Sequence, residues 1–135
     1  MNFIDAVKNY FFKWNDFKSR SSRSEYWWAT VFVTIATYPV AFIIGFLIGA
    51  VFSSAGLSEI AMEVVIGIVI LTLNVFISVA TISLVVRRLH DVDRSGWWYL
   101  IIFTIIGVIP LLIWLCIRGT NGDNRFGKNP LEQLH

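Results

Sequence analysis

Residues 87–98 read Arg-Arg-Leu-His-Asp-Val-Asp-Arg-Ser-Gly-Trp-Trp and lie between two long apolar stretches of the chain. Six of the first eight residues of this block can carry a charge. Charges this dense beside a membrane set the topology of the chain and need partners. The block therefore marks where the apolar stretches end, and it is the first place to look for a site.

The composition indicates that a lipid bilayer is the solvent of this protein. Hydrophobic residues make up 56% of its 135 residues. Three stretches contain no charged residue, at residues 26–52, 64–86 and 97–117. Each reaches the length of about 20 residues with which a helix crosses a hydrocarbon core of about 30 Å. The predicted fold class is therefore all-α integral membrane, a single membrane domain over residues 1–135 with three transmembrane helices at about these positions.

The first 28 residues predict an amphipathic helix and a membrane entry point. Within residues 3–17, aromatic and aliphatic residues recur at helical spacing, which before a membrane span is typical of a helix lying in the interface. Residues 18–25 form a polar, basic connector, and Ser24 is expected to cap the first span. Two pairs of tryptophans are expected to anchor the chain at headgroup level: Trp27, Trp28, Trp97 and Trp98.

The third apolar stretch allows two structures, because Gly107 and Pro110 lie near its middle. One is a kinked spanning helix, and the other is a re-entrant hairpin that turns between these residues. The spanning helix is preferred because a hairpin of 21 residues leaves backbone groups to be satisfied inside the membrane. The polar tail at residues 118–135 is rich in Gly, Asn and Asp, which favour turns.

The distribution of basic residues predicts a cytoplasmic N-terminus. With three spans in this orientation, eight Lys and Arg side chains lie inside and three lie outside, whereas the reverse orientation gives three and eight. This topology places the three basic residues of the tail outside. A re-entrant third segment would return the tail to the inside.

Two sets of residues predict helix packing in the membrane. Small residues let helices approach closely, and a deep amide or hydroxyl needs a partner. The partner is either the same chain or a second copy. If copies assemble, the polar set can instead line the pore of a small-solute transporter or channel. The residues are Ala41, Gly45 and Gly49 in the first span, and Asn74, Ser78 and Thr81 in the second.

The charged block has three interpretations. The first is a structural loop of ion pairs and interface anchors, which is what charges at the ends of spans usually form. The second is a pocket for a lipid headgroup or another anionic ligand, since clustered arginines bind phosphate. The third is a metal or acid–base centre around His90 and Asp91, which is short of ligands.

Several classes of site have no support in the sequence. Cys116 is the single cysteine, so no intrachain disulfide and no cysteine-rich metal site can form. The chain has no Gly-rich phosphate loop and no zinc signature. We therefore expect no cofactor, no metal site, no catalytic residues and no nucleic-acid partner, and we expect a protein that is not an enzyme.

Three strings in this order resemble a bacterial inner-membrane family catalogued as domain of unknown function 805. They are residues 17–27 (Phe-Lys-Ser-Arg-Ser-Ser-Arg-Ser-Glu-Tyr-Trp), residues 87–98, and residues 119–130 (Gly-Thr-Asn-Gly-Asp-Asn-Arg-Phe-Gly-Lys-Asn-Pro). The chain departs from the family pattern at Ser19, where Gly is usual, and at Asn129, where Asp is usual. The resemblance implies a multi-span protein of the inner (plasma) membrane without an established activity.

These observations predict a function and a set of binding residues. We expect an adaptor, regulatory or headgroup-sensing module that acts through a cytoplasmic charged face, with membrane lipids, a second copy or another membrane protein as partners. Glu25 is expected to pair with Arg87 or Arg88. The candidate ligand or headgroup residues are Arg20, Arg23, Glu25, Arg87, Arg88, His90, Asp91, Asp93, Arg94, Asn124 and Arg125.

Overall fold

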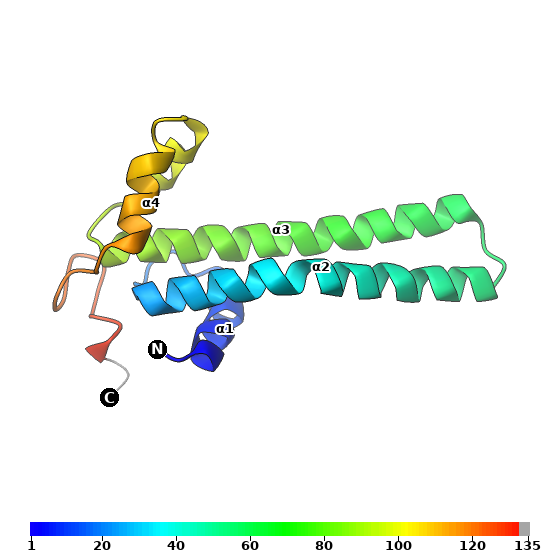
Figure 1. The fold of residues 1–135 in the computed structure, drawn as a ribbon, viewed down its shortest axis with the longest axis horizontal. Helices are drawn as coiled ribbons and strands as arrows, with labels where there is room; N and C mark the ends of the chain where they lie inside the picture. The colour runs from blue at the N-terminus through cyan, green and yellow to red at the C-terminus, as the bar shows by residue number, and fades with distance from the viewer. Residues whose placement is uncertain (133–135) are drawn as a thin grey trace. The chain divides into compact units, whose positions relative to one another are not determined.

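The computed structural model describes residues 1–132, and the last three residues of the predicted tail, 133–135, lie outside the described part. Every regular element in that part is a helix (Figure 1). An isolated bridge between Asn124 and Gly127 is the single strand-like pairing among the described residues. The elements are α1 (Phe3–Phe12), α2 (Arg23–Ser54), α3 (Glu59–Asp91), the 3-10 helix η1 (Gly96–Phe103) and α4 (Val108–Cys116).

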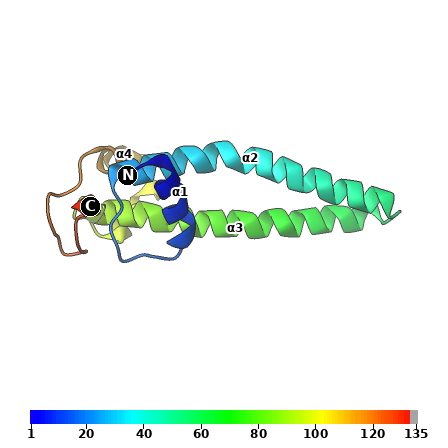
Figure 2. The ribbon, with the colours of Figure 1, turned by 90° about the horizontal axis from the view of Figure 1, so that it is seen from below.

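The chain divides into two compact units. The second, Val31–Ser78, is a helical hairpin made of the end of α2 and the start of α3, which lie side by side in both ribbon views (Figures 1 and 2). Gly56, with φ +64°, ends α2 by accepting the left-handed conformation that a side chain disfavours. The Leu57 amide donates to Phe52 O (3.1 Å) and the Gly56 amide to Ser53 O (3.3 Å), which is the Schellman pattern.

The hairpin unit has an apolar surface and no buried residue. Its two stretches of 24 and 20 helical residues are about 36 and 30 Å long at 1.5 Å per residue, which matches a hydrocarbon core of about 30 Å. α2 and α3 are the two described helices that are long and apolar enough to cross a membrane. Core helices of soluble proteins can pass that test, but they are mostly buried, whereas the apolar windows of α2 and α3 are 0% and 6% buried.

The first unit, residues 1–30 and 79–132, contains every buried residue of the described chain. Ala6 and Tyr10 of α1 are buried one helical turn apart, and the Tyr10 hydroxyl lies 3.0 Å from Thr81 Oγ1 of α3. Burial raises the pKa of the Tyr10 phenol. α1 ends at Phe12 and not at residue 17 as predicted, with Lys13 as its C-terminal cap. Asp16 then turns the chain by accepting the amides of Lys18 and Ser19.

α2 begins at Arg23, and its N-terminal cap is Ser22 and not Ser24 as predicted. Ser22 Oγ accepts the Glu25 amide at 3.2 Å, the bond by which a capping serine satisfies a free N–H of the first turn. The string Ser22-Arg-Ser-Glu25 has the spacing of a capping box, which is the signal that identifies the cap in the sequence. In this chain the Glu25 side chain is used elsewhere, as described below.

The third apolar stretch does not form the continuous spanning helix that we preferred. η1 ends at Phe103, the chain turns over Thr104–Gly107, and α4 follows with nine residues, about 14 Å long. Thr104 Oγ1 accepts the Gly107 amide (3.0 Å) and donates to Ile101 O (2.8 Å), so the turn satisfies its own polar groups. A Cβ on Gly107 would collide with the Ile101 carbonyl, so only glycine fits there. Pro110 follows in the first turn of α4, where its missing N–H costs no helical bond.

Candidate functional site

The last two turns of α3 place three charged residues in the interior of the first unit. Arg87, Arg88 and Asp91 are each at most 4% exposed. Arg88 and Asp91 share one side of the helix because they are three residues apart, and they form an ion pair. Arg87 lies on a neighbouring side, so the two adjacent arginines meet different partners.

Arg20 joins the connector, α3 and the tail through a single guanidinium. Its Nη2 and Nε donate to Asp91 Oδ1 at 3.0 and 3.2 Å. The same guanidinium donates to the carbonyls of Thr120 (3.0 Å), Gly122 (2.8 Å) and Gly127 (3.1 Å). A planar fork with five N–H donors suits such a hub. The tail is therefore folded onto the connector and onto the end of α3.

Arg88 connects the same carboxylate to the end of α4. Besides its ion pair with Asp91, its guanidinium donates to the carbonyls of Leu115 (3.3 Å) and Ile117. The last carbonyls of a helix have no partner within the helix, and a cation at that end is also favoured by the helix dipole. Arg88 thus fixes where the hairpin of η1 and α4 ends.

Arg87 pairs with Glu25, so the structure selects one of the two partners that the sequence offered. Arg87 Nη1 lies 2.8 Å from Glu25 Oε1, and both side chains are at most 1% exposed. The Arg87 carbonyl accepts the Ser21 amide at 3.0 Å, which ties the connector to α3. Arg87 Nε and Nη2 have no hydrogen-bond partner within the described residues.

Asn124, His90 and Phe126 close the network on the tail side. The imidazole of His90 stacks on the ring of Phe126, with centroids 3.9 Å apart and planes within 4°. His90 Nδ1 lies 3.2 Å from the Ser19 carbonyl. Asn124 Nδ2 donates to His90 O and to Thr120 Oγ1, both at 2.9 Å. These are the contacts of a packed, hydrogen-bonded side chain.

The buried charges form a structural core of ion pairs, which is the first of the three interpretations of this block, and Arg87, Arg88 and Asp91 are not part of an exposed charged face. Taking an ion out of water costs several kcal/mol even in a relaxed protein, and it is tolerated where ion pairs and carbonyls satisfy the donors. Arg20, Arg88 and Asp91 meet that condition. The sequence does not distinguish buried ion pairs from exposed charges in this block, because helical spacing alone does not say what lies opposite each side chain.

The remaining predicted charges lie on the surface of the first unit. Arg125 pairs with Asp93 at 3.1 Å, with both side chains well exposed. The Arg94 guanidinium lies over the Trp114 ring, 5.1 Å from its centroid. Arg23 is exposed and makes one long contact, 3.4 Å, with the Cys116 carbonyl.

The predicted anchor tryptophans lie on the surface, whereas the predicted packing residues differ in their burial and contacts. The four anchor tryptophans are all exposed, between 40% and 79%. Gly49 faces Met62, and a Cβ there would lie 3.9 Å from its sulfur, whereas Gly45 has nothing within 4 Å. Ala41 is half-buried and Ser78 is exposed. The Asn74 amide donates to Ile70 O one turn back on its own helix, at 2.8 Å.

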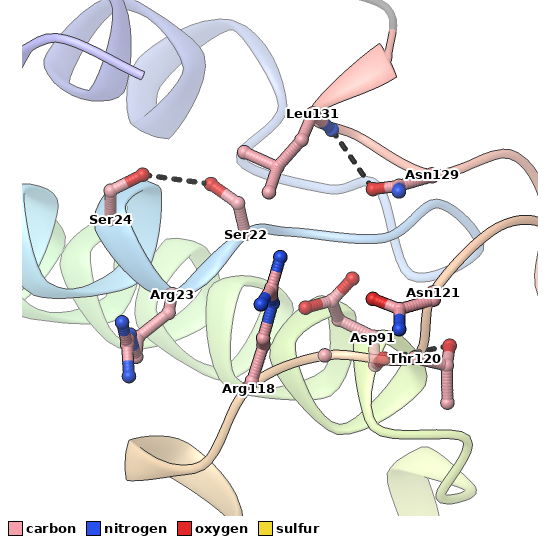
Figure 3. A pocket seen from close by; sticks show the side chains of 10 residues that line it. Ser22, Arg23, Ser24, Asp91, Arg118, Thr120, Asn121, Asn129 and Leu131 are labelled. Carbon is pink, nitrogen blue, oxygen red and sulfur yellow. Dashed lines mark hydrogen bonds between the residues drawn. The ribbon is translucent and has the colours of Figure 1, made fainter.

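A cavity of about 270 Å³ opens beside the buried network (Figure 3). Figure 3 shows the Arg118 side chain pointing into it between Ser22 and Asp91. The walls come from the start of α2, the end of α3 and the tail. The lining residues are Ser22, Arg23, Ser24, Asp91, Arg118, Gly119, Thr120, Asn121, Asn129 and Leu131.

The sequence reasoning missed Arg118, Gly119 and Thr120 as members of this site. Gly119 lies against the Asp91 carboxylate so closely that a Cβ would overlap it. Thr120 donates its amide to the Asp91 carbonyl at 2.9 Å. The available signal was the Gly-Thr pair that follows Arg118 at the end of the last apolar stretch, because a glycine there allows close approach of the backbone.

Comparison with known proteins places the chain among membrane proteins without an assigned activity. A sequence model of the family described as "Protein of unknown function (DUF805)" matches residues 14–128. Inner membrane protein YhaI of Escherichia coli (strain K12) is 32% identical over 133 residues, 95% of this chain and 93% of its own. Inner membrane protein YhaH of the same strain is 31% identical over 129 residues, 95% of this chain and 94% of its own. No solved structure matches the chain.

Proposed function

The chain belongs to the family of proteins of unknown function DUF805, and from that premise we propose that it is a two-span bacterial inner-membrane protein with a headgroup-sensing, non-enzymatic cytoplasmic face. α2 and α3 cross the bilayer, and the hairpin of η1 and α4 is re-entrant or interfacial. The N-terminus, the block at residues 87–98 and the tail then share the cytoplasmic side.

One observation carries this proposal: all 11 Lys and Arg residues lie in the first unit and none lies between residues 31 and 78. The charged residues beside the turn between α2 and α3 are both acidic, Glu59 and Glu63. The positive-inside rule therefore favours this topology. Two spans place the three basic residues of the tail inside, whereas three spans place them outside. The contacts of Arg20 with the tail carbonyls support it as well.

A headgroup sensor fits the exposed part of this face. Arg23, Arg94 and Arg118 are exposed on the unit that contains the anchor tryptophans. Basic side chains near a membrane surface attract anionic lipids with about 1 kcal/mol each. The large apolar residues of α1 fit the same surface, because Phe3, Ile4 and Phe12 are 42–83% exposed and suit an interfacial helix.

The topology is tested by fusing reporters after residue 132 and into the turn at residues 55–58. A reporter active only in the cytoplasm should give signal at the tail and none at the turn. A tail fusion without cytoplasmic reporter activity would refute the two-span topology.

Headgroup sensing is tested by native mass spectrometry of the purified full chain. We expect enrichment of anionic over zwitterionic lipid relative to the membrane from which the protein was extracted. An equal ratio of anionic to zwitterionic lipid on the protein and in the membrane would refute headgroup sensing.

A further inference from the structure

The cavity beside Asp91 contains one cationic and one neutral hydrogen-bond donor, Arg118 and Asn121, that have no partner among the described residues, and we propose that it binds a phosphate group with Arg118 as its principal ligand. The ligand is a phosphate ester on a lipid headgroup or on a soluble molecule. This inference deepens the headgroup-sensing proposal, on which its lipid form rests.

The Arg118 guanidinium has no hydrogen-bond or ion-pair partner among the described residues. Its guanidinium points into the cavity next to Asp91 (Figure 3). Both oxygens of that carboxylate are already engaged, Oδ1 by Arg20 and Oδ2 by Arg88. Asp91 therefore cannot serve as a full counter-ion for a third guanidinium.

Positive charges outnumber negative charges around the cavity. Two arginines line it, Arg23 and Arg118, and two more contact its Asp91, Arg20 and Arg88. Among the described residues that line the cavity, Asp91 is the single carboxylate. Arg23 also lines the cavity, and among the described residues its guanidinium makes one contact, at 3.4 Å with the Cys116 carbonyl. A cleft with such a surplus concentrates anions, because low-dielectric walls focus the field.

The chemistry and the size of the cavity both fit a phosphate group. The Asn121 side chain makes no hydrogen bond among the described residues and lies in the cavity wall, where its amide can donate to a phosphate oxygen. Guanidinium groups match phosphate geometry in a bidentate manner. About 270 Å³ is slightly below the usual range for drug-sized ligands, about 300–1,000 Å³. A phosphate or a small headgroup is therefore the appropriate occupant.

The test uses the full-length protein in neutral detergent with inorganic phosphate as the probe and chloride at equal ionic strength as the reference. Phosphate should bind more tightly than chloride, and Arg118→Gln should weaken phosphate binding about tenfold or more, the loss expected for one charge-assisted pair. Lys18→Gln is the matched control, because it removes one positive charge from an exposed side chain that does not line the cavity, and it should leave phosphate affinity unchanged. Thermal unfolding of each variant shows whether it is folded.

A second arm distinguishes the two sources of phosphate. The protein is placed in nanodiscs of phosphatidylcholine with or without phosphatidylglycerol, and competition by inorganic phosphate is measured. If the anionic lipid weakens phosphate binding in the wild type but not in Arg118→Gln, the ligand is a headgroup. If it does not compete, the ligand is a soluble phosphate compound.

Two outcomes overturn the inference: phosphate binding that Arg118→Gln leaves unchanged, or binding no tighter than that of chloride. If Arg118→Gln loses phosphate binding but retains the full enrichment of anionic lipid, headgroup sensing stands without this cavity, and the ligand of the cavity is a soluble phosphate compound. If the wild type shows no lipid enrichment but binds phosphate through Arg118, the sensing proposal fails and the site stands. Arg118→Lys, which keeps the charge and loses the fork, should bind with intermediate affinity.

Discussion

The Arg20 guanidinium lies 3.0 Å from the Asp91 carboxylate, although 71 residues separate them in the chain. Both side chains are buried, at 1% and 5% exposure. The pair brings the connector before α2 against the last turn of α3, and the other donors of Arg20 hold the tail there. The three strings that mark the family are thus parts of one folded unit.

Asp91→Asn should destabilise the first unit by about 3–5 kcal/mol, because it leaves the Arg20 and Arg88 guanidiniums buried without a counter-ion. Chemical denaturation in detergent measures this change in the free energy of unfolding. Asp93→Asn is the control, since its ion pair with Arg125 is exposed and should contribute less than about 1 kcal/mol. Equal losses in the two variants would contradict the role of Asp91.

Glu25 and Arg87 should couple strongly in a double-mutant cycle. Glu25→Met or Arg87→Met alone leaves one buried charge unpaired and should cost about 3 kcal/mol or more, whereas the double variant should recover much of that loss. Thermal unfolding of the four proteins gives the coupling energy. The same cycle between Glu25 and Arg88 should show much weaker coupling, and strictly additive effects for Glu25 and Arg87 would argue against the observed pair.

Gly119→Ala should disrupt the site without any change of charge. Its methyl group would overlap the Asp91 carboxylate, and overpacking of this kind typically costs about 1–3 kcal/mol. Gly67→Ala is the matched control, because nothing lies within 4 Å of its added Cβ and alanine favours a helix by about 1 kcal/mol over glycine. A comparison of unfolding midpoints checks this, and a midpoint for Gly119→Ala at or above that of the wild type would refute the close approach.

Asp16 should make stability depend on pH at the acidic end. Burial by itself would raise the pKa of its carboxyl, but the hydrogen bonds from the Ser19 side chain and from the Lys18 and Ser19 amides, together with Arg87, hold the pKa below its ordinary value of 3.8. A group with a lowered folded pKa contributes stability that is present above 3.8 and is lost as the pH falls through the folded value.

Asp16→Asn should therefore be less stable than the wild type at neutral pH, with a difference that narrows below pH 3.8. Unfolding midpoints between pH 2 and pH 7 test this, with Asp5→Asn as a carboxylate control on α1. A difference that stays constant across the acidic range would contradict the assignment to the ionised Asp16 carboxylate.

The fold was predictable where composition and helical spacing decide it. Charge-free stretches at residues 26–52 and 64–86 predicted α2 and α3, since length and hydropathy are local properties of the chain. Residues 97–117 passed the same test of length but form η1 and α4. The turn there depends on the Thr104 hydroxyl and on the close approach of Gly107 to Ile101, which are details of local packing.

The pattern of residues along the chain is enough to identify a helical membrane protein of a family of unknown activity whose charges cluster in three strings. Which of these charges are buried and which are free depends on the folded structure. Arg88 and Arg118 both flank apolar segments, yet Arg88 has a carboxylate and two carbonyls opposite it, whereas Arg118 points into a cavity. The physical reason is that the energy of a charge depends on what surrounds it in space, and its neighbours along the chain do not fix those surroundings.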